Sequence, residues 1–135
     1  MKEGKELAVK VRNFLNVFTS WNFQIQQEGD TYVVGTSLEN EQGHHMIVCY
    51  EIHNESVRLR VTAIDCKCTP EYIMEKVKSA GLQFKVNAVE LGESVFALEK
   101  TTTTKVLDHR LFAIARDQMT AMMEIMSEII HEKAV

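Results

Sequence analysis

Two neighbouring runs of alternating residues, at 46–52 and 57–64, constrain the fold of this chain more than any other feature. In the second run Val57, Leu59 and Val61 alternate with arginine and threonine. This period of two is typical of a half-buried β-strand, because successive side chains of a strand point to opposite faces of the sheet. The polar residues between the two runs predict a tight connection, so the sequence indicates an antiparallel hairpin.

The two strands of this hairpin fit together in one register. When Ile52 lies opposite Val57, every apolar residue of one strand meets an apolar residue of the other, whereas a shift of one residue would turn the whole set to the other face. The opposite face then carries a favourable cross-strand pair of charges. The register pairs Tyr50 with Leu59, Val48 with Val61, Met46 with Ala63 and, on the opposite face, Glu51 with Arg58.

The preceding residues extend the hairpin to a four-stranded antiparallel meander from residue 23 to residue 64. Gly29-Asp30 is a turn signal that places Ile25 opposite Val34 and Phe23 opposite Thr36, and the polar segment 39–43 returns the chain. A sheet face this apolar must be covered by other elements. The predicted face contains Trp21, Phe23, Ile25, Tyr32, Val34, Val48, Tyr50, Ile52, Val57, Leu59 and Val61.

Residues 3–18 predict an amphipathic helix that covers part of this face. Leu7, Val11, Phe14 and Phe18 follow helical spacing, with charged residues elsewhere. A helix that binds a partner would show the same pattern, but packing on the sheet is the favoured interpretation.

A second helix is predicted from Pro70 to about Ala80. Thr69 as the N-cap, proline in the first helical position and an acid next to it form a helix start, and Gly81 is a suitable stop. Two further strands follow, near residues 82–90 and 94–100. Their apolar residues share one face only if their connection holds an odd number of residues or a bulge. The buried stripe of the helix would be Ile73, Met74 and Val77.

The last predicted helix, residues 105–131, is the longest element. Thr104 is its expected N-cap, and Asp108 is expected in or near its first turn. Together these elements predict a single α+β domain over residues 1–135, in two layers, with an antiparallel sheet. The apolar side of the last helix would contain Leu107, Leu111, Ile114, Met119, Met122, Met126, Ile129 and Ile130.

Composition narrows the classes of function. The net charge of −4, with lysine and arginine scattered, argues against nucleic acid or an anionic membrane as the main partner. There is no apolar run long enough to span a membrane and no export signal at the start of the sequence. Three cysteines without regular spacing suggest reduced thiols, so we expect a cytoplasmic protein.

Few residues point to chemistry. His44, His45, His53 and Cys49 match no metal-binding spacing, so we expect no metal. Cys66-x-Cys68 is not a redox motif; a lowered thiol pKa before a helix is physically possible, but two ordinary small residues are favoured. The glycines form no phosphate loop, and no nucleophile elbow is present. We therefore expect neither an enzyme nor a bound cofactor.

The methionines of the last helix are the candidate interaction residues. Met119, Met122, Met123 and Met126 cluster there beside Ala121 and Ile125 and leave little of the circumference polar. Methionine suits adaptable apolar surfaces. Either this helix forms a protein-interaction seam, with a two-fold homodimer preferred, or it is simply more deeply buried.

The order of elements resembles that of the YbjN-type domains, described as bacterial sensory transduction regulators, which share the fold of type III secretion chaperones. The resemblance rests on the hairpin EIHNESVRLRV at residues 51–61, the Thr69-Pro70-Glu71 helix start and the second hairpin before a final helix. It covers nearly the whole chain. It implies a small non-enzymatic cytoplasmic protein that dimerises and binds other polypeptides.

Two functions follow as hypotheses. The first is a protein-interaction module, chaperone-like or regulatory, that binds polypeptide partners as a homodimer. The second is a small-ligand-binding protein with a pocket between the long C-terminal helix and the sheet, lined by Trp21, Phe23 and Tyr50. A filled helix–sheet interface with an exposed apolar patch would favour the first, and an empty closed pocket the second.

Overall fold

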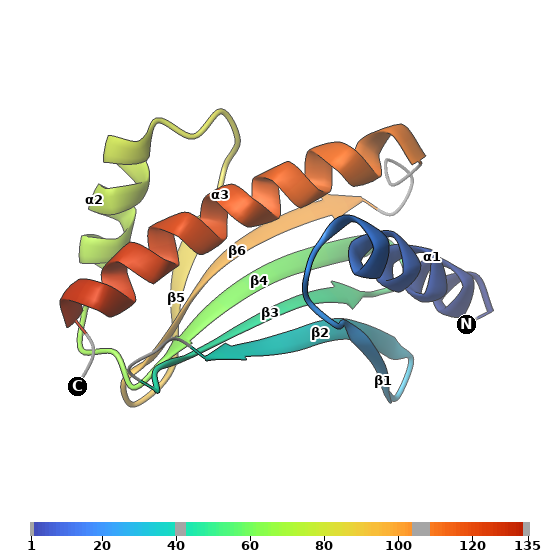
Figure 1. The fold of residues 1–135 in the computed structure, drawn as a ribbon, viewed down its shortest axis with the longest axis horizontal. Coiled ribbons are helices and arrows are strands. Elements are labelled where there is room, and N and C mark those ends of the chain that lie inside the picture. The colour runs from blue at the N-terminus through green and yellow to red at the C-terminus, as the bar shows by residue number, and fades with distance from the viewer. Residues whose placement is uncertain (1, 40–42, 104–108, 134–135) are drawn as a thin grey trace.

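The computed structural model describes residues 2–39, 43–103 and 109–133. The fold is α+β, with three helices and a six-stranded antiparallel sheet in the predicted order. The helices α1 and α3 lie across the sheet, and α2 lies beside one end of α3 (Figure 1). The predicted N-cap Thr104, together with Leu107 and Asp108, lies outside the described residues. The helices are α1 (Lys2–Phe18), α2 (Pro70–Ala80) and α3 (His109–Lys133).

The sheet has the strand order β1-β2-β3-β4-β6-β5. The first four strands form the predicted meander, and the second hairpin adds β6 next to β4 and β5 at the edge. The strands are β1 (Gln24–Glu28), β2 (Thr31–Glu39), β3 (His45–Ile52), β4 (Ser56–Ile64), β5 (Asn87–Gly92) and β6 (Val95–Thr103).

The register of the central hairpin is the predicted one. Ile52 pairs with Val57, and all the other predicted pairs of β3 and β4 follow, including Glu51 with Arg58. Ile25 pairs with Val34 as expected. Phe23, however, lies outside β1, whose pairing with β2 ends at Gln24, so the predicted pair with Thr36 does not form.

A side-chain clamp explains why β1 does not reach Phe23. The amide nitrogen of Phe23 donates to Asn16 Oδ1 at 2.6 Å, and Asn16 Nδ2 donates to the carbonyl oxygen of Phe23 at 3.1 Å. Both backbone groups of Phe23 are thus bonded to α1 and are not available for a strand ladder. Its ring is buried all the same.

The second hairpin contains the irregularity that its apolar pattern required. Ala88 pairs with Leu98, and the register then shifts between Glu90 and Gly92, which is a bulge. Strand β5 begins later than predicted, because residues 82–86 belong to the connection from α2 and pairing starts at Asn87.

Helix α2 begins and ends at the predicted residues. Thr69 Oγ1 accepts a hydrogen bond from the amide of Tyr72 at 3.1 Å, and Pro70 opens the helix. Gly81 has a left-handed backbone conformation, with φ at 65°, which glycine adopts without a Cβ penalty. Ile73 and Val77 are buried, but Met74 is exposed, so the predicted stripe is one residue too wide.

None of the described helices combines the length and the apolar character needed to cross a membrane.

Candidate functional site

Helix α3 turns its methionine-rich side inward. Met119, Met122 and Met126 are fully buried, and Met123 is 8% exposed. All four belong to the hydrophobic core of the single chain. The expectation of an exposed seam built from these methionines is therefore corrected: deeper burial of the helix, the alternative interpretation, accounts for their clustering.

Helix α2 is a second element, besides the sheet, that packs against α3. It lies against the C-terminal half of α3, which also rests on the sheet (Figure 1). Two ion pairs connect these helices, from Lys76 Nζ to Glu128 Oε1 at 3.5 Å and to Glu132 Oε1 at 2.8 Å. The Tyr72 hydroxyl also donates to Glu132. The second contact surface inferred from the sequence is thus made within the chain.

The helix–sheet interface around Tyr50 is filled. The Tyr50 hydroxyl donates to the carbonyl oxygen of Ala115 on α3 at 3.1 Å, and burial raises the pKa of this phenol. The spaces next to it measure only about 10 and 20 Å³, which is room for about one water molecule. Phe23 is also buried. The predicted ligand pocket lined by Tyr50 and Phe23 is therefore absent from the described part of the interface.

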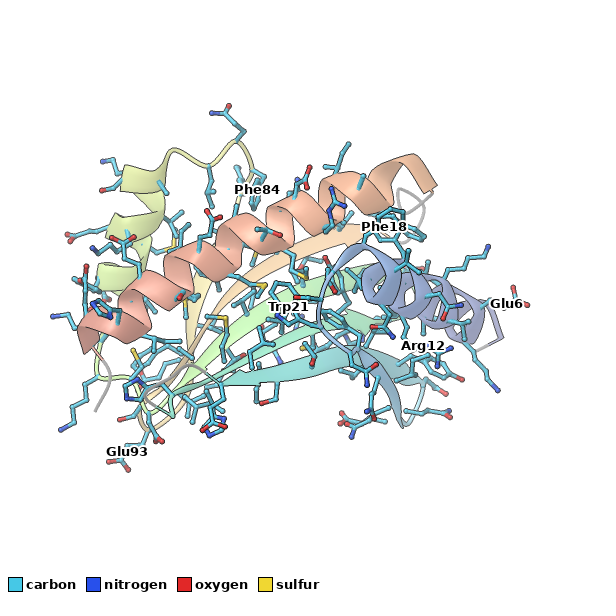
Figure 2. The ribbon with its side chains drawn as sticks, in the orientation of Figure 1. Glu6, Arg12, Phe18, Trp21, Phe84 and Glu93 are labelled. Atoms are coloured by element: carbon cyan, nitrogen blue, oxygen red, sulfur yellow. The ribbon has the colours of Figure 1, made fainter. Side chains whose placement is uncertain are left out.

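A groove of about 350 Å³ does lie beside α3, where the helix crosses the ends of β2 and β3. Trp21 is the one predicted pocket residue that lines it. In Figure 2 the Trp21 side chain lies below α3, over the sheet and near the connection from α1. The volume is within the range of small-molecule sites. The apolar part of the lining consists of Trp21, Leu38, Met46, Met123 and Ile130.

Two exposed apolar side chains lie next to each other at the C-terminal end of α1, where this helix meets the N-terminal half of α3: Val17 is 74% and Phe18 56% exposed. We refer to these two residues as the Phe18 surface. Ile114 on α3 is also 50% exposed, but it lies about half a helical turn away from Phe112 and Arg116, the α3 residues that contact Phe14 and Phe18. The rings of Phe14, Phe18 and Phe112 connect the two helices here, with centroids 4.6 Å apart for Phe14–Phe18 and 5.5 Å for Phe14–Phe112. Figure 2 shows Phe18 at this junction, beside α3.

The exposure of Phe18 and of Ile114 contradicts two sequence predictions, because Phe18 was expected in the buried stripe of α1 and Ile114 in that of α3. On α1 the most buried residues are Ala8, Val11 and Leu15. The predicted Leu7 and Phe14 pack against the core but are only partly buried. The most buried stripe has the same helical spacing as the predicted one and shares Val11 with it, so periodicity alone cannot choose between them. The predicted stripe left out Leu15, although this residue is also apolar. Together with the predicted stripe it gives α1 a wider apolar side than the sheet can cover.

Cys66 and Cys68 lie close together, with their sulfur atoms 3.9 Å apart. Burial raises the pKa of the Cys66 thiol, and burial with the neighbouring Cys66 raises the pKa of Cys68 to about 12. Cys68 also lines a depression of about 490 Å³ in front of Tyr72 and Lys133. The possibility of a lowered thiol pKa before α2 is therefore contradicted, because burial outweighs the nearby Lys133 ammonium group.

The histidines do not converge. His44 lines the groove, whereas His53 lies at the other end of β3, with Nδ1 3.3 Å from Thr31 Oγ1 and Nε2 3.7 Å from Glu51 Oε1. His45 is exposed on β3. In the part of the chain that the structure describes, no three histidine, cysteine or acidic side chains are placed to share a metal ion.

The outer face of the sheet carries a row of charges. Arg60 on β4 lies between Glu51 on β3 and Glu99 on β6, with Arg60 Nη1 3.1 Å from Glu51 Oε2 and a direct hydrogen bond to Glu99. Both carboxylates raise the pKa of the Arg60 guanidinium. Arg58 Nη1 lies 3.6 Å from Glu51 Oε1, as the predicted register implied. Every charge in this row faces one of opposite sign, so the row stabilises the sheet rather than forming an open charged site.

Comparison with known proteins leaves the chain without a match: no family model, no curated protein and no solved structure is similar to it. The resemblance to YbjN-type domains stays a prediction.

Proposed function

We propose that this chain is a non-enzymatic protein-interaction module that binds polypeptide partners, a second copy of itself included, through the Phe18 surface. The observation that carries the proposal is the exposure of two adjacent apolar residues, Val17 and Phe18, where α1 meets α3 next to a filled core. Exposed apolar residues that are scattered singly need no explanation, but large adjacent ones that include an aromatic ring are typical of protein contacts.

Two further features support this choice. The spaces around Tyr50 are too small for a ligand, which supports the protein-interaction hypothesis. Arg116 lies over the Phe18 ring, 6.0 Å from its centroid. An aromatic ring with an arginine beside it is the composition that interface hot spots favour. The homodimer is the preferred assembly, because a two-fold contact uses the same surface twice.

The test is the oligomeric state of a Phe18→Glu variant. Phe18 is exposed, so the change leaves the fold intact while it places a charge at the centre of the contact. We expect the wild-type chain to sediment as a dimer at high concentration and the variant as a folded monomer. The matched control is Met74→Glu, since Met74 is also an exposed apolar residue but lies on α2, away from the contact.

Two results would count against the proposal. One is a wild-type chain that stays monomeric, together with a Phe18→Glu variant that still binds every partner of the wild type. The other is a Met74→Glu variant that disrupts the assembly as much as Phe18→Glu does, because the effect would then not be specific to the junction.

A second candidate function, binding of a small ligand, is favoured by the groove beside Trp21. Its volume of about 350 Å³ and its five apolar lining residues suit a small apolar molecule. The fluorescence of Trp21 tests it, because this is the single tryptophan of the chain and it lies in the groove wall.

A further inference from the structure

The groove beside Trp21 combines an apolar floor with an acidic rim. Glu39, at the end of β2, and Glu124, on α3, both line it, and both are exposed. Apart from His44, none of the other described lining residues can carry a positive charge. The permanently charged side chains around the groove are therefore of one sign.

Neither carboxylate is neutralised within the described residues. The ion pairs of α3 there involve Asp117, Glu128 and Glu132, and those of the sheet involve Glu51 and Glu99. Glu39 and Glu124 take part in none of them. Two negative charges at the mouth of a low-dielectric cleft attract a cation more strongly than the same charges would on an open surface.

The indole of Trp21 provides an apolar surface for the body of a ligand, next to Met123. The hydroxyl groups of Thr120 and Ser127, on the α3 wall of the groove, can accept hydrogen bonds from an ammonium group. Thr120 Oγ1 donates its own proton to the carbonyl oxygen of Arg116 at 3.0 Å, so its oxygen is free to accept.

We propose that this groove binds an amphiphilic cation, a molecule with an apolar body and one ammonium group, with the body on the Trp21–Met123 floor and the ammonium between Glu39 and Glu124. The inference rests on the ligand-binding candidate above and names its ligand class. At about 30 Å³ for each water-sized group, 350 Å³ hold about a dozen non-hydrogen atoms. That is the size of an alkylamine or arylalkylamine.

The experiment titrates the full chain with three probes of equal chain length that differ only in head group: decylammonium, decanol and decanoate. Fluorescence of Trp21 reports occupancy. We expect decylammonium to saturate with a Kd on the order of 0.1–1 mM. It should bind about three- to tenfold more tightly than decanol, since each exposed charge pair contributes modestly. Decanoate should bind more weakly than decanol.

Matched variants locate the effect. The double change Glu39→Gln and Glu124→Gln should bring the affinity for decylammonium down to that for decanol, while decanol binding stays the same. Glu128→Gln is the control on the same helix, because Glu128 faces Lys76 and not the groove. It should leave the preference intact. Ser127→Phe, at an exposed position of the wall, should fill the groove and weaken all three probes.

The outcomes separate two failures. If decanol binds as tightly as decylammonium, or if the double variant keeps the preference, the inferred ligand class is wrong while the groove remains a ligand site. If none of the probes changes Trp21 fluorescence, or if Ser127→Phe leaves all affinities unchanged, the groove is not a ligand site at all. Circular dichroism of each variant confirms that the fold is kept.

Discussion

Replacement of Met122 by alanine tests whether the methionines of α3 form core or surface. Met122 is fully buried between α3 and the rest of the core. Truncation of a buried methionine costs about 2–5 kcal/mol, the sum of the lost transfer free energy and the cavity left behind. A domain of this size is stable by about 5–15 kcal/mol, so the variant should still fold.

Met74→Ala is the matched control. It makes the same change in side chain and helix propensity, but Met74 is exposed on α2. Its free energy of unfolding should change by no more than about 0.5 kcal/mol. The difference between the variants therefore measures burial alone.

Urea unfolding followed by far-ultraviolet circular dichroism gives both values. With a slope of about 2 kcal/mol per molar urea, the midpoint of Met122→Ala should fall by about 1–2.5 M, and that of Met74→Ala should hardly move. A loss below about 1 kcal/mol for Met122→Ala, or equal losses for the two variants, would refute the placement of this side of α3 in the core.

Three further changes follow from the structure. Burial, followed in size by the charge of Glu51, raises the pKa of the Cys49 thiol from 9.0 to about 11. As the pH rises, the unfolded chain therefore releases this proton before the folded chain does. The free energy of unfolding of the wild type should fall between about pH 9 and 11, by up to about 1.4 kcal/mol per pH unit from this group. Urea titrations at several pH values should show a smaller loss for Cys49→Ala. Arg60→Met leaves the mostly buried carboxylates of Glu51 and Glu99 without their shared cation, and should lower the free energy of unfolding at pH 7 by about 1–3 kcal/mol in thermal unfolding. Thr69→Ala removes the N-cap of α2 and should cost about 1 kcal/mol in urea unfolding, whereas Thr69→Ser should cost little.

The sheet was predictable because its signals are local. Period-two alternation and a short polar connection between residues 46 and 64 leave one register for β3 and β4, and the structure has that register. The start and end of α2 were equally readable, since Thr69, Pro70 and Gly81 act through their own backbone neighbours. The apolar pattern required either a connection with an odd number of residues or a bulge, and the structure has a bulge between Glu90 and Gly92.

The sides of the helices that meet the core were harder to predict, because they depend on residues far away in the sequence. On α3, the apolar residues around Met122 and Ile125 looked too many for one covered face, but both are buried within the chain, where α3 packs against the sheet, α1 and α2. On α1, two stripes of equal spacing overlap at Val11, and the sheet covers the one that contains Leu15. Periodicity alone could not show that Phe18 is the apolar residue of α1 that stays exposed.

The candidate sites were predicted only in part. A pocket between the C-terminal helix and the sheet was expected to be lined by Trp21, Phe23 and Tyr50, and of these only Trp21 lines the groove beside α3. Its partners Glu39 and Glu124 come from the end of a strand and the middle of a helix, 85 positions apart by their numbers. Nothing in the local sequence marks either of them, since both look like ordinary solvated carboxylates.

Hydrogen–deuterium exchange of the full chain at increasing protein concentration tests the proposed interaction surface most directly. Amides of the last turn of α1, around Phe18, and of α3 from Phe112 to Arg116 should become more protected as copies associate. Amides from Met119 to Ile130, already within the core, should not change. Protection that increases over residues 119–130 instead, or that increases nowhere, would contradict the proposal that this chain binds polypeptides through the Phe18 surface.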